Sequence, residues 1–281
     1  MPAAEYLLGT ALTEQQRQTM LYEALGDTLR DRMKEVMALA ALPAGADPEL
    51  TRVLEVGCSQ GHFIADLLQK YPQIDILGLD INANSVAYAQ EHVASARAHF
   101  RAHDITDPLP DEVGCDFSLA IASLVLCHIK KPDQALAHMA AALQPGKILF
   151  LRDPDFDSFW FPHPALDTLL HVLSEAITRV AGQNFARRHF AALHAADLMP
   201  LTSYYLHVPM GGPTWRGRQL LHNFYDAVKI MRPHITGSLH LLDPCDFDAL
   251  IAACEREVTS SMEGEIILID TIARKRLCYG A

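Results

Sequence analysis

The spacing of hydrophobic positions changes twice along this chain of 281 residues and divides it into three parts. From Thr13 to Leu42, apolar residues recur at steps of three and four, which is the spacing of one face of a helix. Pro43, Gly45 and Pro48 then end the helical pattern. Residues 1–49 are therefore predicted to form a helical cap at the amino terminus.

Between residues 50 and 155, short apolar runs alternate with helical segments that begin at His62, Asn84 and Pro132. The expected strands are RVLEVG, DILGLD, HFRAHDI, FSLAIAS and KILFLRD, and Gln144-Pro145-Gly146 breaks the chain before the last of them. This alternation is typical of a parallel sheet with helices on both faces. The middle part is thus predicted to be a Rossmann-like α/β core.

Residues 156–281 are expected to complete the core and to carry an insertion. The segment DPDFDSFWFPHP predicts a turn, and helices are expected over residues 165–180 and 188–198. Residues 207–250 combine Gly, Pro and His with the helical segment RGRQLLHNFYDAVKIM, which predicts a helical lid rather than sheet. The final IILIDTIAR is predicted to rejoin the sheet beside an earlier strand.

Composition and charge narrow the classes of partner. Half of the residues are hydrophobic and the net charge is −11, so the chain can bury a large core and repels a phosphate backbone. The longest apolar run, Phe117 to Cys127, is far shorter than a membrane span of about 20 residues. Six cysteines without a C-x-x-C pair and an amino terminus without secretory features predict free thiols in the cytoplasm. The fourteen histidines include no H-E-x-x-H, so no metal is expected.

The segment VLEVGCSQGHF is the most informative one for chemistry. Glu55, Gly57, Ser59 and Gly61 fall at the turn between the first strand and the first helix, which faces the ligand crevice in such folds. Glycine there permits positive φ and close approach of a ligand to the main chain. Ser59 and His62 replace two glycines of the dinucleotide fingerprint G-x-G-x-x-G, which disfavours a nicotinamide enzyme. An ordinary tight turn is the alternative interpretation.

A second acid supports a nucleoside ligand. Asp80 ends the strand ILGLD nineteen residues after Gly61, where a carboxylate can accept hydrogen bonds from both ribose hydroxyls. Taken alone, Asp80 could equally be the N-cap of the next helix. The combination of strand, glycine turn and acid favours the ribose role.

These residues resemble motif I of the class I S-adenosylmethionine-dependent methyltransferases, E/D-x-G-x-G-x-G, with Ser59 in place of the middle glycine. Three further segments resemble the ubiquinone/menaquinone-biosynthesis-like, small-molecule branch of that family: LQPGKILFLRDPDFDS, GQNFARRHFAALHAADL and YLLGTALTEQQRQ. The resemblance implies a mostly parallel sheet of seven strands. It also implies S-adenosyl-L-methionine as cofactor and S-adenosyl-L-homocysteine as product.

The resemblance further implies which residues contact the cofactor. Ile81 would lie flat on the adenine, and Asp104 would bind the adenine amino group unless it only stabilises a turn. The full set of implied cofactor contacts is Tyr6, Glu55, Gly57, Cys58, Ser59, Gly61, Asp80, Ile81, Asp104, Ile105 and Ser123.

Candidate catalytic bases are His128, just beyond the fourth expected strand, and His207 and His222 in the lid. Aromatic faces attract a sulfonium cation and stack on flat acceptors. Packing within the lid is the alternative role for each aromatic candidate, namely Tyr6, Trp160, His163, Trp215 and Tyr225. The cluster Arg187-Arg188-His189 could hold an acidic acceptor or form a solvated helix face.

The sequence therefore predicts methyl transfer by in-line displacement to a small apolar or aromatic acceptor, in secondary or quinone-like metabolism, through an oxygen, nitrogen or carbon nucleophile. The first alternative is a protein of the same fold that catalyses a rearrangement or elimination with the cofactor bound. A non-catalytic interaction module stays open as another alternative, and so does homodimerisation.

Overall fold

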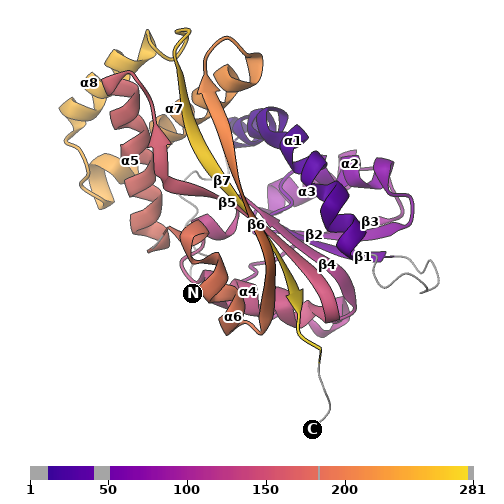
Figure 1. The fold of residues 1–281 in the computed structure, drawn as a ribbon. Helices are drawn as coiled ribbons and strands as arrows, with labels where there is room; N and C mark the ends of the chain where they lie inside the picture. The colour runs from indigo at the N-terminus through magenta and orange to yellow at the C-terminus, as the bar shows by residue number, and fades with distance from the viewer. Residues whose placement is uncertain (1–11, 41–50, 183, 278–281) are drawn as a thin grey trace.

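The computed structural model describes residues 12–40, 51–182 and 184–277. Its centre is one sheet of seven strands in the order β3-β2-β1-β4-β5-β7-β6 (Figure 1). The strands β1 to β5 run parallel to one another, and β7 runs antiparallel to both β5 and β6. The strands are β1 Thr51–Val56, β2 Ile74–Asp80, β3 Ala98–Ala102, β4 Phe117–Ser123, β5 Leu143–Trp160, β6 Leu198–Gly211 and β7 Glu263–Lys275.

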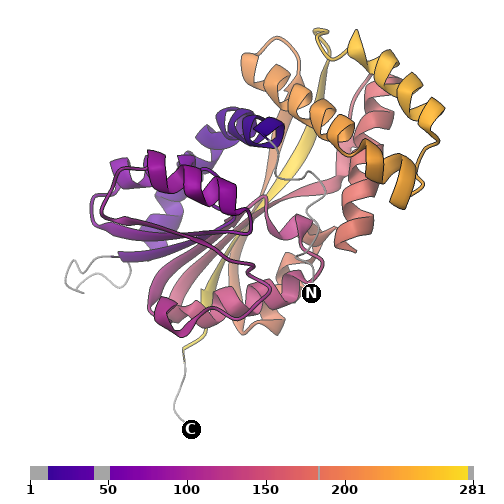
Figure 2. The same cartoon turned by 180° about the vertical axis from the view of Figure 1, so that it is seen from behind.

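Helices cover both faces of this sheet. One face packs on α1 and α2, and the other packs on α4 and α6; the two groups lie on opposite sides of the strands in Figures 1 and 2. The α-helices are α1 Leu12–Ala40, α2 His62–Lys70, α3 Ala83–His92, α4 Pro132–Ala142, α5 Pro164–Ala181, α6 His189–Ala195, α7 Trp215–Ile230 and α8 Pro244–Glu255. Short helical turns are η1 Asp111–Val113, η2 Leu126–His128, η3 Phe185–Arg188 and η4 His234–Ser238.

Local sequence explains the elements of the core. The central strand β4 is buried over most of its length, as expected for a continuous apolar run with helices on both faces. The helix α2 buries Phe63, Ile64, Leu67 and Leu68 on one side. The side chain of Asn82 accepts hydrogen bonds from the amides of Asn84 and Ser85 and thereby caps α3. The predicted alternation of strands and helices between residues 50 and 153 is confirmed.

Beyond this core, β5, β6 and β7 continue as a long extension that carries α5, α7 and α8 (Figure 1). The prediction of a turn in DPDFDSFWFPHP is wrong for its first eight residues, because β5 continues through Trp160 and pairs with β7. The break predicted at Gln144-Pro145-Gly146 is a register shift inside β5 rather than a loop. The expected helix over 165–180 is confirmed as α5, and the expected return of IILIDTIAR to the sheet is confirmed as β7.

Residues 207–211, predicted to begin the lid, instead complete strand β6. The sequence does not predict this strand, since Pro200 and Pro209 interrupt it. A proline is tolerated here because, among the described strands, β6 lies at the edge of the sheet and pairs with β7 alone. The remainder of the predicted lid is helical, with α7, η4 and α8.

Several predictions concern residues 1–11, 41–50 and 278–281, which lie outside the described ranges. They include the cofactor contact Tyr6 and the helix breakers Pro43, Gly45 and Pro48. Within the described ranges, five cysteines are free thiols. None of the helices in those ranges is both long and apolar enough to cross a membrane. The same residues contain no cluster of three His, Cys, Asp or Glu side chains able to hold a metal ion.

Candidate active site

The turn between β1 and α2 lies at the carboxyl end of β1, beside the point where the strand order reverses between β1 and β4. Three alternate residues of this turn have left-handed backbone: Gly57 with φ 74°, Ser59 with φ 47° and Gly61 with φ 77°. The amides of Gly57 and Cys58 both donate to the carbonyl of Leu79 on β2. The turn is therefore anchored to the neighbouring strand, at the crevice where such sheets bind ligands.

Gly57 permits a close approach between this turn and the exit of β4. A Cβ atom built on Gly57 would lie 2.2 Å from Cγ2 of Val125, so no side chain fits there. The next residue, Cys58, is buried and packs beside Gly78, so only its main chain is available to a ligand. The exit of β4 and the glycine turn thus form one continuous wall.

Gly57→Ala should lower the free energy of unfolding by about 2–5 kcal/mol, because it adds a clash with Val125 to a left-handed backbone. Gly182→Ala is the matched control: Gly182 also has a left-handed φ of 80°, but a Cβ there meets no atom within 4 Å. Its expected cost is about 1–2 kcal/mol. Urea unfolding of both variants measures the difference, and equal losses would contradict this account of Gly57.

Asp80, the last residue of β2, points back to the glycine turn. Its Oδ2 accepts a hydrogen bond of 2.8 Å from the amide of Ser59, and its Oδ1 accepts one of 2.8 Å from the amide of Asn82. Burial raises the pKa of this carboxyl, and the two amides oppose that shift. Each carboxylate oxygen has a second lone pair, so this geometry leaves acceptor capacity for two hydroxyl groups.

Glu55 lies on β1 below the turn and is almost fully buried. Among the described residues, none donates a hydrogen bond to its Oε2. Desolvation, and secondarily the charge of Asp80, raise the pKa of Glu55 to about 8. A buried acceptor without a donor is costly, which favours a donor or cation supplied by a ligand.

The other predicted cofactor contacts lie at the carboxyl ends of neighbouring strands. The side chain of Ile81 follows β2 and is 41% exposed, so its apolar surface is open to a ligand. Asp104 follows β3, and its Oδ1 accepts hydrogen bonds from the amide and the hydroxyl of Thr106. Asp104 thus stabilises this turn, and its contact with adenine stays a prediction. Ile105 is buried and its carbonyl accepts from Nδ1 of His138. Ser123 ends β4 and precedes Leu124, which has an unusual φ of 61°.

Comparison with known proteins agrees with this arrangement. A family model described as a methyltransferase domain matches residues 54–149, from β1 into β5. Residues 54–149 are therefore similar to methyltransferase domains. The matched region contains the glycine turn, Asp80 and the exit of β4.

Similar proteins include enzymes named trans-aconitate 2-methyltransferase. The one from Variovorax paradoxus is 29% identical over 135 residues, covering 48% of this chain and 49% of the relative. The one from Afipia carboxidovorans is 25% identical over 235 residues, covering 78% of this chain and 84% of the relative. The crystal structure of the cyclase SpnF matches with a TM-score of 0.55 and 18% identity, covering 98% of each chain. The chain spans about half or less of the length of the first curated relatives.

Among the candidate bases, His128 lies nearest to the glycine turn. It ends η2, three residues after the Val125 that contacts Gly57. Burial, and then the Arg17 guanidinium, lower the pKa of His128 to about 4, while Asp153 opposes the shift. At neutral pH the imidazole is therefore uncharged and only weakly basic.

The structure does not bring His207 to this part of the sheet. His207 lies on β6, four strands away from β1, which corresponds to about 19 Å. Its side chain is 62% exposed and pairs with Glu265. His222 lies on α7 and is partly buried, beside Asn223, which bonds to Arg17 of α1. Its catalytic role stays a prediction.

The aromatic candidates are also separated. The side chains of Trp160 and Trp215 are about half exposed, whereas Tyr225 is buried in the core between α5, α7 and α8. His163 is the N-cap residue of α5. The packing interpretation is confirmed for Tyr225.

The side chains of the basic cluster Arg187-Arg188-His189 pair with aspartates of the same chain. Arg187 pairs with Asp155, and His189 is buried between Asp153 and Thr271. Nη2 of Arg188 lies 3.7 Å from Oδ2 of Asp133 on α4. The solvated helix face expected for all three residues is therefore wrong for His189, because a buried carboxylate binds it.

The first half of α1 lies over the glycine turn, a contribution that the sequence does not predict. Gln60 donates from Nε2 to the carbonyl of Gln15, and Thr19 donates from its hydroxyl to Oε1 of Gln60. The hydroxyl of Ser59 donates to Oε1 of Gln18. The only sequence signal was a run of polar residues on one helix face, which is equally typical of solvent exposure.

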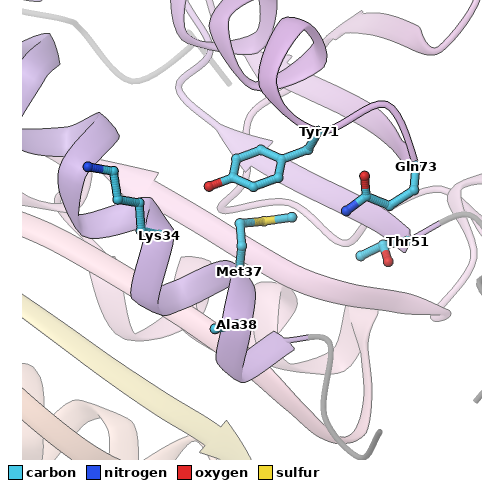
Figure 3. A pocket seen from close by; sticks show the side chains of 6 residues that line it. All are labelled: Lys34, Met37, Ala38, Thr51, Tyr71 and Gln73. Atoms are coloured by element: carbon cyan, nitrogen blue, oxygen red, sulfur yellow. The ribbon is translucent and has the colours of Figure 1, made fainter. Parts of the chain in front are cut away.

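A separate cavity of about 290 Å³ lies at the opposite end of β1 (Figure 3). It is lined by Lys34, Met37 and Ala38 of α1, by Thr51, and by Tyr71 and Gln73 near the end of α2. Residues 41–50, which follow α1 and precede β1 in the sequence, lie outside the described ranges. This cavity is therefore separate from the glycine turn and Asp80.

Proposed function

We propose that the chain binds S-adenosyl-L-methionine at the Glu55 to Gly61 turn and transfers its methyl group to a small-molecule acid. The observation that carries the proposal is the pairing of the left-handed turn with the Asp80 carboxylate beside the point where the strand order reverses. Asp80 would bind the ribose, Ile81 the adenine face, and Glu55 a positive charge of the amino-acid part. When bound, the cofactor supplies a methyl group already activated on a sulfonium.

The weak basicity of His128 supports an acceptor that needs no deprotonation. A base with a pKa of about 4 would take a proton from a phenol with a pKa of about 10 at a cost of about 8 kcal/mol. A carboxylic acid is already ionised at neutral pH, so its oxygen can attack in line without a base. Positioning by the chain would then supply most of the acceleration.

The names of similar proteins agree with an acid. Several are named trans-aconitate 2-methyltransferase, and one from Mycolicibacterium smegmatis is named fatty-acid O-methyltransferase. The apolar or aromatic acceptor predicted from the sequence is the competing hypothesis. Because the structurally similar SpnF is a [4+2]-cyclase, the fold alone does not imply methyl transfer.

Methyl-labelled S-adenosylmethionine, offered with a panel of di- and tricarboxylic acids, fatty acids and phenols, tests the proposal. We expect label in a methyl ester together with one equivalent of S-adenosylhomocysteine. Label in phenols only would favour the aromatic acceptor. Substrate conversion without release of S-adenosylhomocysteine would favour a rearrangement and contradict the proposed transfer.

The pH dependence of binding tests the role of Glu55. Because its pKa in the free protein is raised to about 8, Glu55 is protonated at pH 7 and must lose its proton beside a cation. Affinity for S-adenosylhomocysteine should therefore rise as pH increases from 6 to 8, by up to about tenfold per unit, and flatten above 8.

Calorimetric titration at pH 7 in two buffers of different ionisation enthalpy measures the proton release directly. Release of nearly one proton is expected for the native protein, and none for Glu55→Gln. Equal proton release by both proteins would remove Glu55 from the cationic site.

A further inference from the structure

Ser59 makes two hydrogen bonds through different atoms. Its amide donates to Oδ2 of Asp80 at 2.8 Å, and its hydroxyl donates to Oε1 of Gln18 on α1 at 2.6 Å. A glycine at this position could form only the first of these bonds. Ser59 thus joins the carboxylate of Asp80 to the helix that covers the turn.

The contacts between α1 and the turn all come from one helix face. Gln15, Gln18, Thr19 and Tyr22 are spaced by three, four and seven residues, so their side chains share that face. These residues make two further contacts beside the bonds to Ser59 and Gln60. The hydroxyl oxygen of Thr19 lies 3.4 Å from Nε2 of His62, and the ring of Tyr22 stacks on the ring of His62. The first half of α1 therefore meets the turn through polar and stacking contacts.

The second half of α1 is held differently. Leu29, Met33 and Val36 are buried in the core formed with α2 and the sheet. Burial of apolar side chains is lost when such a helix separates, whereas a polar contact at the surface can be exchanged for water. The first half of α1 is also anchored away from the turn, because Arg17 exchanges two buried hydrogen bonds with Asn223 of α7 and because Ala24 and Leu25 lie in the core.

Ser59 also has a backbone conformation that disfavours a side chain. Its φ of 47° is left-handed, where glycine is the preferred residue. The bond from its hydroxyl to Gln18 offsets part of this cost. A serine at this position gives the turn a contact that the family's glycine lacks.

We propose that Ser59 is a positioning residue that fixes the first half of α1 across the cofactor turn and sets the rate at which the cofactor enters and leaves. This inference rests on the proposed function, since it assumes that the turn binds the cofactor. The hydrogen bond between Ser59 and Gln18 forms when the first half of α1 covers the turn, which we call the closed form. Its loss therefore favours the open form, in which this part of α1 has left the turn, both with and without cofactor.

Stopped-flow measurement of S-adenosylhomocysteine binding to the native protein, Ser59→Ala, Gln18→Ala and the double variant tests this role. Each single variant should raise the association and the dissociation rate constants by about fivefold, the change that one hydrogen bond of average strength produces. The dissociation constant should stay within about twofold, since both rates change together. The double variant should equal the singles, because the two residues share one bond.

Ser59→Gly and Ser95→Ala complete the set. Ser59→Gly should raise both rates as Ser59→Ala does, without lowering the melting temperature, because glycine relieves the left-handed backbone. Ser95→Ala, in the turn between α3 and β3, should leave both rates unchanged. Unchanged rates in Ser59→Ala, or multiplicative effects in the double variant, would overturn the inference.

Hydrogen exchange of the free protein separates this inference from the proposed function. Amides of residues 15–22 should exchange faster in Ser59→Ala than in the native protein, whether or not any ligand binds. Equal exchange would overturn the positioning role of Ser59. Failure of the native protein to bind S-adenosylhomocysteine, with faster exchange in the variant, would refute the proposed function and leave the contact with α1 in place.

Discussion

Asp80→Ala is expected to weaken the binding of S-adenosylhomocysteine by about 100-fold or more. The carboxylate can offer one acceptor to each ribose hydroxyl, and a hydrogen bond to a charged group contributes about 1.5–3 kcal/mol. Loss of two such bonds therefore exceeds the ~2.7 kcal/mol that corresponds to 100-fold. Calorimetric titration of the native and variant proteins measures the ratio of dissociation constants.

Two controls separate ligand binding from folding in this experiment. Asp75→Ala changes a carboxylate at the other end of the same strand, which pairs with His99, and should leave the affinity unchanged. The melting temperature of free Asp80→Ala reports the loss of the contacts with Ser59 and Asn82. An affinity within twofold of the native value, in a folded variant, would contradict the ribose role of Asp80.

The second large effect is on stability and concerns a buried ion pair between β5 and β7. Arg152 of β5 makes two hydrogen bonds with Asp270 of β7, at 2.6 and 2.7 Å, and both side chains are almost fully buried. Arg32 of α1 also donates to Asp270, and Thr28 accepts from Arg152. Asp270→Ala would leave a buried guanidinium without its carboxylate and should cost about 3–5 kcal/mol of unfolding free energy.

Chemical denaturation of three variants tests this expectation. The double change Arg152→Met with Asp270→Leu should be less destabilising than Asp270→Ala, because it leaves no unpaired charge in the core. Asp248→Ala removes the exposed partner of Arg232 and should change the unfolding free energy by less than ~1 kcal/mol. A loss for Asp270→Ala no larger than that for Asp248→Ala would contradict the proposed importance of the buried pair.

The core could be predicted from sequence because its signals are local. Strands β1, β2 and β4 are short apolar runs next to a turn or cap, and Asn82 caps α3 within three residues. The glycine turn and Asp80 were found for the same reason, as their spacing follows from one strand, one helix and the next strand. The left-handed φ values of Gly57 and Gly61 confirm the conformational reason for glycine there.

The extension could not be predicted because distant residues stabilise it. Asp153 and Asp155 suggested a turn, yet they lie inside β5, where His189 and Arg187 bind their carboxylates. Neither partner is visible from the local pattern. Strand β6 was missed because its prolines indicate a loop unless the strand is known to lie at the edge of the sheet.

The site was predicted incompletely for a similar reason. The bonds of Gln18 to Ser59 and of Gln15 to Gln60 join residues that are 41 and 45 positions apart. Without the fold, polar residues on α1 look like a solvated surface. Conversely, the sequence predicts a lid around His207, whereas the sheet places this residue on an exposed edge strand.

A crystal structure of the full chain with S-adenosylhomocysteine tests the central claim most directly. The account predicts both ribose hydroxyls within hydrogen-bond distance of the Asp80 carboxylate, the adenine against Ile81, and the amino-acid part along the Glu55 to Gly61 turn. A ligand bound elsewhere, or a turn closed by the protein's own side chains with Asp80 facing only Ser59 and Asn82, would contradict it.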